Sequence, residues 1–85
     1  MKIYHLPKFV RLYKKLPDEI KDLAEKKEKI FRRHPFSPNL KTHKLKGEFD
    51  GFWAFSLNYK YRIIFDFVDE DDVRFYLVGD HNIYD

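Results

Sequence analysis

The pattern of residues 61–68 predicts the central strand of a β-sheet. Side chains of a strand alternate between its two faces, so every second residue shares a face. One face carries large β-forming residues, which are Tyr61, Ile63, Phe65 and Phe67. The other face carries Arg62, Ile64, Asp66 and Val68. The first face needs an apolar cover, whereas the guanidinium of Arg62 is costly on such a strand unless it meets an anion or open water. We therefore expect the first face to form the core and the face of Arg62 to carry the function.

Two further segments alternate in the same way and predict strands over about residues 51–58 and 73–79. Their expected inward residues are Trp53, Phe55, Leu57, Val73, Phe75 and Leu77. Residues 58–60 and the acidic residues 69–72 are short connections, and short connections join antiparallel neighbours. The three strands should therefore form an antiparallel meander. A short strand over residues 2–6, ended by Pro7, precedes them in the chain.

Residues 7–34 have the spacing of two amphipathic helices. The apolar stripe of the first helix, which should end at Lys15 or Leu16, is Phe9, Val10, Tyr13 and Leu16. The stripe of the second helix is Ile20, Leu23, Ala24, Lys27, Ile30 and Phe31. Pro17 can occupy the start of the second helix, where the helix dipole favours the carboxylates of Asp18 and Glu19. Pro35 should end that helix.

These elements predict one α+β domain over residues 1–85 with the order β-α-α-β-β-β. A chain of this length suffices for one modest core but not for two. Helix stripes and strand stripes need each other for burial, so both helices should pack on one face of a twisted antiparallel sheet. The covered face should be lined by Trp53, Phe55, Ile63, Phe65, Phe75 and Leu77. The other face should be open.

Charge is distributed unevenly along the chain, although the net charge is only +3. Residues 1–47 carry 14 Lys and Arg against 5 acids, net +9, and residues 48–85 carry 3 against 9, net −6. The basic half is a plausible footprint for nucleic acid or for an acidic protein partner. It can also be the solvated surface of the helices. The absence of cysteine is compatible with a reducing cytoplasm, and neither a signal peptide nor a membrane span is apparent.

Several kinds of chemistry lack the groups that they require. The three glycines form no phosphate-binding loop, no serine lies in a nucleophile elbow, and the four histidines have no known metal-ligand spacing. We therefore expect neither a metal nor another cofactor. Cations, imidazoles and a phenol remain, and they are Lys41, His43, Lys44, Lys46, Arg62, His81 and Tyr84.

This set suits the cleavage of RNA without a metal. Such cleavage needs a base to activate the ribose 2′-hydroxyl, cations to stabilise the phosphate charge, and an acid for the leaving 5′-oxygen. Each residue also has a structural interpretation. The lysines can be solvated loop charges, Arg62 can be a cross-strand partner of Asp66, and His81 and Tyr84 can be surface residues of the tail. We interpret His5 and His34 as structural.

Five short segments, in this order, resemble the RelE/ParE toxin superfamily over nearly the whole chain. They are residues 16–19, 43–47, 51–53, 61–65 and 79–84. The resemblance is closest to bacterial ribosome-dependent mRNA interferases of type II toxin–antitoxin systems. It implies a fold of two helices on one face of a twisted antiparallel sheet. It also implies a cytoplasmic endoribonuclease that inhibits translation, with a cognate antitoxin and mRNA on the ribosome as partners, and with no membrane partner.

The resemblance implies roles for individual residues. The arginine that matches Arg62 contacts the scissile phosphate, the residue that matches His81 lies beside it, and a terminal tyrosine matches Tyr84. One branch uses a histidine at the position of His43. The expected catalytic residues are therefore Arg62, His81, His43 and Tyr84, with Arg62 first among them. The expected RNA-binding residues are Lys41, Lys44, Lys46 and Lys60.

The chain also departs from the family. The branch with the histidine at position 43 places a further histidine and an aspartate where this chain has Ser56 and Lys60. Another branch uses two strand lysines where this chain has Trp53 and Phe55. These departures leave the general base open. They also leave two alternatives open. One is a ParE-like inhibitor that binds DNA gyrase without nuclease activity, and the other is a degenerate toxin without activity.

Overall fold

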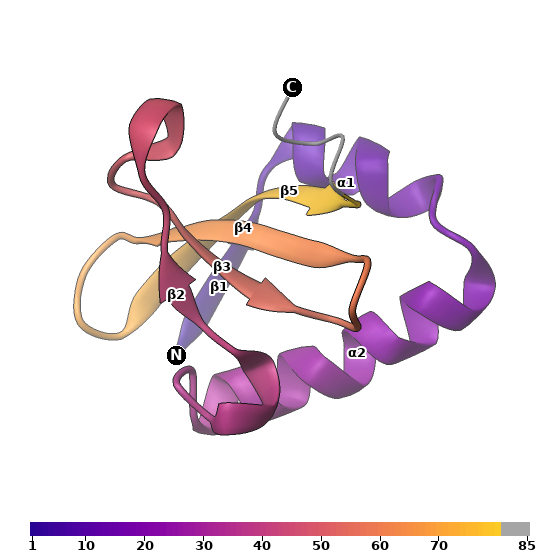
Figure 1. The fold of residues 1–85 in the computed structure, drawn as a ribbon, viewed down its shortest axis with the longest axis horizontal. Coiled ribbons are helices and arrows are strands. Elements are labelled where there is room, and N and C mark those ends of the chain that lie inside the picture. The colour runs from indigo at the N-terminus through magenta and orange to yellow at the C-terminus, as the bar shows by residue number, and fades with distance from the viewer. Residues whose placement is uncertain (81–85) are drawn as a thin grey trace.

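In the computed structural model, which describes residues 1–80, two α-helices lie against a sheet (Figure 1). The elements are β1 (Lys2–His5), α1 (Pro7–Lys14), α2 (Asp18–Arg33), η1 (Pro38–Leu40), β2 (His43–Lys44), η2 (Gly47–Phe49), β3 (Trp53–Ser56), β4 (Arg62–Phe67) and β5 (Asp72–Gly79). Within the described residues the strand order is β1-β5-β4-β3-β2, so β4 is the central strand as predicted. The predicted α+β class and the order of the helices and the longer strands are confirmed.

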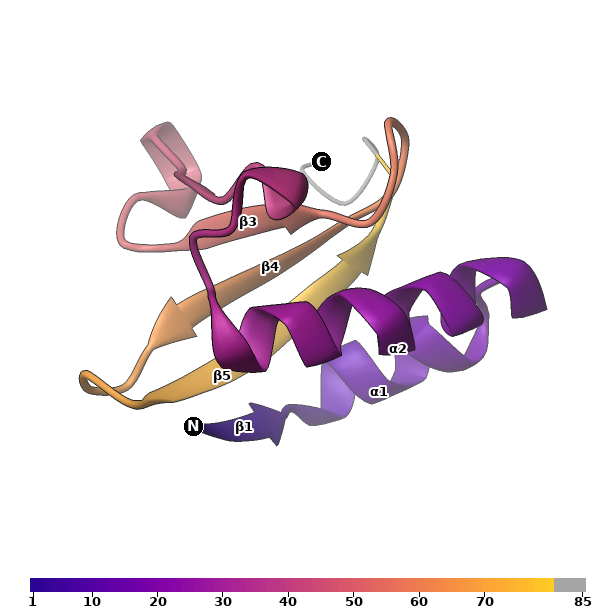
Figure 2. The ribbon, with the colours of Figure 1, turned by 90° about the horizontal axis from the view of Figure 1, so that it is seen from below.

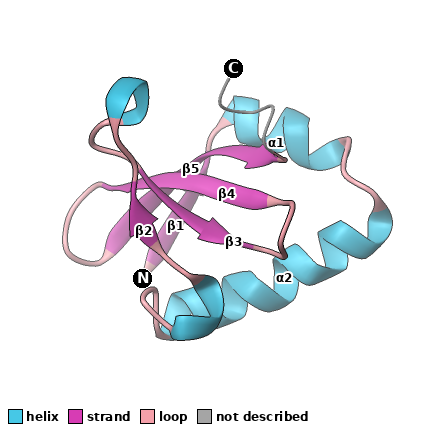
Figure 3. Ribbon diagram, in the orientation of Figure 1, coloured by secondary structure: helices cyan, strands magenta, loops and turns pink. Residues whose placement is uncertain are grey.

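The sheet contains two features that the hydrophobic pattern did not predict (Figure 3). Strand β1 pairs with β5 in parallel, so the sheet is mixed rather than wholly antiparallel. Strand β2 adds an edge in which His43 lies opposite Ala54 of β3. Alternation of side chains indicates which face a residue occupies but not the direction of its neighbour, and a strand of two residues is too short to show a period.

The core lies between the helices and one face of the sheet. Phe31 of α2 is fully buried, and its ring centroid lies 4.7 Å from that of Phe55, 4.9 Å from that of Phe65 and 5.6 Å from that of Phe75. Phe9 of α1 packs on Phe75 at 5.4 Å. Figure 2 shows α1 and α2 together on one side of β4 and β5. The expected packing of both helices on one face is thus confirmed.

One predicted inward residue is wrong because β5 contains a bulge. The register pairs Ile64 with Leu77 but Phe65 with Phe75, so β5 has one extra residue at this point. A bulge moves the residues that follow it to the opposite face. Leu77 therefore lies on the face away from the helices, beside Ile64, and Val78 takes its place in the core with 1% exposure.

The face away from the helices, called the outer face below, is only partly open. Ala54 and Ile64 lie on it, yet neither has exposed surface. The rings of Phe52 and Tyr76, both half-buried, meet edge to face with their centroids 4.7 Å apart. Because the bulge places both Tyr76 and Leu77 on this face, it carries more apolar cover than strict alternation allows. The prediction of a fully open face is wrong in this respect.

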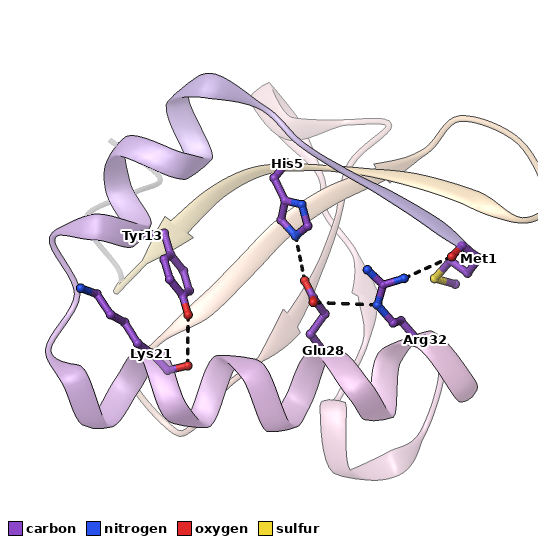
Figure 4. Close-up of polar contacts among 6 residues, drawn as sticks. All are labelled: Met1, His5, Tyr13, Lys21, Glu28 and Arg32. Carbon is purple, nitrogen blue, oxygen red and sulfur yellow. Dashed lines mark hydrogen bonds and ion pairs between the residues drawn. The ribbon is translucent and has the colours of Figure 1, made fainter.

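Polar contacts join β1 and α1 to α2 (Figure 4). His5 Nε2 lies 2.9 Å from a carboxylate oxygen of Glu28, Arg32 donates to the carbonyl oxygen of Met1, and the Tyr13 hydroxyl donates to the carbonyl oxygen of Lys21. Burial, with Glu25, Glu28 and Asp22 nearby, raises the pKa of Tyr13 above its ordinary value. Across residues 1–80, neither helix has the length and apolar character that crossing a membrane requires.

Candidate functional site

Arg62 begins β4 on the outer face of the sheet. Its neighbour Ile63 belongs to the core, and side chains alternate, so the guanidinium points away from the helices. The cross-strand neighbours of Arg62 are Ser56 of β3 and Gly79 of β5. Both residues are small, so neither flanks the guanidinium with a bulky side chain. Arg62 is half-buried, in keeping with its predicted position on the strand.

Asp66, the partner that the sequence offered for Arg62, is engaged by another arginine. Arg74 Nε lies 3.0 Å from Asp66 Oδ1, and Arg74 Nη2 lies 2.6 Å from Asp66 Oδ2. This is a two-point pair of the kind that guanidinium and carboxylate form best. The hydrogen bonds that Arg74 donates to Asp66 also raise the pKa of Arg74 above its ordinary value. The structural interpretation of Arg62 as a partner of Asp66 therefore loses its support.

His43 also lies on the outer face, and a backbone contact determines its tautomer. Its Nδ1 is 2.9 Å from the carbonyl oxygen of Lys41. A carbonyl oxygen only accepts hydrogen bonds, so Nδ1 carries the proton, and in the neutral ring Nε2 has the lone pair. Lys41 has the left-handed backbone conformation, with φ 52° and ψ 40°, at the end of η1. The exposed imidazole of His43 can therefore accept a proton through Nε2.

Arg62 and His43 occupy one diagonal of the outer face. His43 is opposite Ala54, Ala54 is opposite Ile64, and Arg62 precedes Ile64 by two positions on β4. Strands about 4.8 Å apart with a rise of about 3.3 Å per residue place the two Cα atoms roughly 12 Å apart. A phosphodiester bound between the two residues can contact the long side chain of Arg62 and the imidazole of His43. The structure thus places two of the predicted catalytic residues on the same surface.

Strand β3 supplies no proton-transfer group to this surface. Trp53 packs against the core and Phe55 belongs to it, so lysines at these two positions would face the helices rather than Arg62. The residues of β3 on the outer face are Ala54 and Ser56. Ser56 lies directly opposite Arg62, where one branch of the resembling family has a histidine. Among the described residues, His43 is therefore the imidazole that lies on the same face as Arg62.

The four predicted RNA-binding lysines do not gather in one place. Lys41 and Lys46 are exposed in the segments that flank β2, and Lys60 is exposed in the turn before Arg62, with Nζ 5.6 Å from the centre of the Tyr61 ring. Lys44 pairs with Trp53 in the register, and its Nζ lies 5.6 Å from the centre of the Trp53 ring. Lys44 therefore lies on the opposite face from His43 and Arg62. The other two predicted catalytic residues, His81 and Tyr84, lie outside the described residues.

The surface around Arg62 is a sheet face rather than an enclosed pocket. A cavity of about 410 Å³ between the helices is lined partly by His5, Phe9 and Glu28, and a hollow of about 540 Å³ lies at the end of α2. Neither is lined by Arg62 or His43. Within residues 1–80, no three His, Asp or Glu side chains are grouped so that they could hold a metal ion. A partly open sheet face that carries Arg62 suits an extended polymer better than a small enclosed ligand.

Neither the known family models nor the curated proteins include a match to this chain. Solved structures do match it. A YoeB/ParE toxin from Agrobacterium tumefaciens has a TM-score of 0.79 at 16% identity, over 95% of this chain and 99% of that chain. The toxin–antitoxin complex RelBE2 from Mycobacterium tuberculosis has a TM-score of 0.77 at 20% identity, over 94% and 96% of the chains. The YoeB–YefM complex from Staphylococcus aureus has a TM-score of 0.76 at 18% identity, over 95% and 97%. At these identities the likeness shows a shared fold.

Proposed function

We propose that this chain, which has the RelE/ParE toxin fold, is the toxin of a type II toxin–antitoxin system and acts as a cytoplasmic mRNA endoribonuclease. The observation that carries the nuclease proposal is the placement of Arg62 and His43 on one face, with His43 Nδ1 hydrogen-bonded to the Lys41 carbonyl. A cation for the phosphate and an imidazole with an available lone pair are two of the three groups that metal-independent RNA cleavage needs.

In the proposed reaction, His43 Nε2 removes the proton of a ribose 2′-hydroxyl. The 2′-oxygen attacks the adjacent phosphorus, and the guanidinium of Arg62 stabilises the charge that develops on the non-bridging oxygens. The bond from phosphorus to the 5′-oxygen then breaks, and an acid returns a proton to that oxygen. His81 is our candidate for the acid. The products are a 2′,3′-cyclic phosphate and a 5′-hydroxyl. The enzyme takes up one proton at His43 and gives one up from the acid.

The remaining predicted residues would bind the RNA. Tyr84 would stack on a base or position the phosphate. Lys41, Lys46 and Lys60 would contact the phosphate backbone near the outer face, since all three are exposed. The proposed substrate is mRNA that is being translated on the ribosome, as the family resemblance implies.

The proposed regulatory partner is a cognate antitoxin. The similar structures include toxin–antitoxin complexes from Staphylococcus aureus and Mycobacterium tuberculosis. Residues 1–47 of this chain carry net +9, so an antitoxin with an acidic or amphipathic segment would be attracted to them. Binding of that segment would keep the toxin inactive until the antitoxin is removed.

Primer extension on a translated mRNA tests the nuclease proposal. We expect the wild-type chain to cut the mRNA, Arg62→Ala to abolish most cutting, and His43→Ala to lower the rate by roughly 10² to 10⁴, the usual contribution of one proton-transfer group. Lys26→Gln is the matched control, because Lys26 is an exposed cation of α2, on the helix side of the sheet. It should retain the catalytic rate.

Two results would contradict the proposal. Unchanged cutting by both Arg62→Ala and His43→Ala would exclude this mechanism, and no cutting by the wild type on or off ribosomes would exclude the nuclease. Growth arrest by His43→Ala with intact mRNA and accumulating DNA breaks would instead indicate a gyrase inhibitor.

A further inference from the structure

A group of three aromatic rings, one exposed and two half-buried, lies on the helix side of the sheet, away from Arg62. This aromatic platform consists of Phe36, Trp53 and Phe67. The ring centroids are 5.3 Å apart for Phe36 and Trp53, 6.1 Å for Phe36 and Phe67, and 5.6 Å for Trp53 and Phe67. Phe36 is 58% exposed, although large apolar side chains are usually covered. Nζ of Lys44 lies 5.6 Å from the centre of the Trp53 ring, so a cation borders the platform.

The platform adjoins the hollow of about 540 Å³ at the end of α2. The hollow is lined by Arg33, His34, Pro35, Phe36, Ser37 and Pro38. Three of these side chains are planar, a guanidinium, an imidazole and a phenyl ring, and no carboxylate is among them. Guanidinium groups and aromatic rings are the groups on which proteins stack unpaired nucleobases.

The segment that carries Phe36 is held in place by hydrogen bonds. The Thr42 hydroxyl donates to the carbonyl oxygen of Pro35, and the backbone N–H of Ser37 donates to the carbonyl oxygen of His34 at 2.9 Å. Leu40, which ends η1, is fully buried and anchors the segment to the core. The Phe36 ring is therefore presented on an ordered backbone, which lowers the entropic cost of binding a ligand there.

The acidic turn that follows β4 is close to Phe67 along the chain, whereas Asp66, directly before Phe67, lies on the outer face and is paired with Arg74. Asp69 accepts hydrogen bonds from the backbone N–H groups of Asp71 and Asp72, and Asp72 accepts one from the backbone N–H of Lys2. These two carboxylates are engaged within the turn and with β1. The charged side chains that line the hollow or border the platform are instead Arg33 and Lys44, which favour an anionic ligand.

We propose that the hollow and the platform bind one unstacked nucleobase of single-stranded RNA. The base stacks on Phe36, and Arg33 and Lys44 bind the neighbouring phosphates. The inference rests on the proposed function for RNA as the ligand, but it places this second contact on the face opposite Arg62 and His43. It also gives Lys44 a role that its position away from the catalytic face otherwise lacks.

Trp53 provides a direct test, because it is the only tryptophan of the chain and belongs to the platform. The purified full chain is titrated with a short single-stranded RNA that carries 2′-O-methyl groups throughout, so that it cannot be cleaved. We expect saturable quenching of the Trp53 fluorescence. Lys15→Ala should show the same quenching, since Lys15 is exposed before the start of α2, whereas the hollow lies at the end of that helix.

Two substitutions of Phe36 separate stacking from apolar contact. Phe36→Leu keeps apolar volume but removes the ring, and it should weaken binding by roughly 5- to 150-fold, the range that one stacked base contributes. Phe36→Tyr keeps the ring and should bind like the wild type. Both changes affect an exposed side chain, so they should leave the fold intact, which a thermal unfolding curve verifies.

The proposal is overturned if the RNA causes no quenching at low salt, or if Phe36→Leu binds the RNA as tightly as the wild type. It is also overturned if Trp53 responds to a purified cognate antitoxin but not to the RNA, because the platform would then be a protein interface. Failure of the nuclease proposal is distinguishable, since it appears as lack of cutting in primer extension and does not affect binding of an uncleavable RNA.

Discussion

The two residues that carry the proposed chemistry, Arg62 and His43, owe their positions to different causes. Arg62 lies on the outer face because it alternates with the large apolar residues Tyr61 and Ile63, and this alternation is visible in the sequence. The tautomer of His43 depends on the carbonyl oxygen of Lys41, which reaches the ring because Lys41 has a positive φ. A lysine carries no signal for that conformation, since glycine and asparagine are the residues that usually adopt it.

Lys41 allows a test of this local geometry. It is the one non-glycine residue with positive φ among residues 1–80. Lys41→Gly should raise the free energy of unfolding by up to about 1 kcal/mol, because glycine adopts this conformation without a steric penalty. The carbonyl oxygen remains, so the contact with His43 is kept. Urea unfolding measures the change, and Lys60→Gly, at a residue without positive φ, is the control that should give no gain.

At the scale of secondary structure, alternation predicted the strands but misassigned the end of β5. Alternation assigns each residue to a face by its position along the strand. A bulge inserts one extra residue, and nothing in the sequence indicates it. Leu77 was therefore expected in the core, where Val78 lies instead. The helix ends were better determined, since Pro17 precedes α2 and Pro35 follows its cap residue, His34.

The bulge predicts an unusual order of stability effects. Val78→Ala removes two methyl groups from the core and should lower the free energy of unfolding by about 2 kcal/mol. Leu77→Ala removes more atoms but from a half-buried position on the outer face, and should cost about 1 kcal/mol. Chemical unfolding of the two variants measures both losses of free energy. A larger loss for Leu77→Ala would mean that the strand follows strict alternation.

The contact between α1 and α2 predicts a loss of stability at alkaline pH. Tyr13 has a raised pKa in the folded chain, caused first by burial and then by Glu25, Glu28 and Asp22. The unfolded chain therefore loses the phenolic proton first, and the stabilisation is complete below about pH 10, the ordinary tyrosine pKa, and is lost as pH rises above it. Tyr13→Phe should flatten this alkaline decline in urea unfolding. Tyr59→Phe, at an 89% exposed residue, should leave the decline as in the wild type.

At the scale of the whole molecule, the sequence predicted the layers but not how the sheet is completed. The apolar stripes required two helices over one sheet face, and this arrangement is observed. The parallel pairing of β1 with β5 joins the first strand to the last, a contact between distant parts of the chain that no local pattern encodes. The burial of Ala54 and Ile64 on the outer face likewise depends on neighbours from other strands.

Charge along the folded chain predicts how the proposed antitoxin associates. Most basic residues of 1–47 lie on α1 and α2, whereas the acidic turn joins β4 to β5, at the opposite end of β4 from Arg62. An acidic partner is therefore attracted to one part of the surface and repelled by another. Long-range attraction acts mainly on the association rate and is screened within about 8 Å at physiological salt. The association rate should fall as salt rises, with little change in dissociation.

Charge reversals on the two parts of the surface distinguish electrostatic steering of the antitoxin from non-specific binding. Lys26 and Lys29 are exposed on α2, and reversing both, Lys26→Glu with Lys29→Glu, should slow association and reduce its salt dependence. Glu70→Lys in the exposed acidic turn should accelerate association or leave it unchanged, because it removes repulsion from the incoming chain. Stopped-flow measurement with purified antitoxin at several salt concentrations gives both rates. If association is independent of salt, or if reversal of the α2 lysines accelerates it, the basic half does not guide the partner.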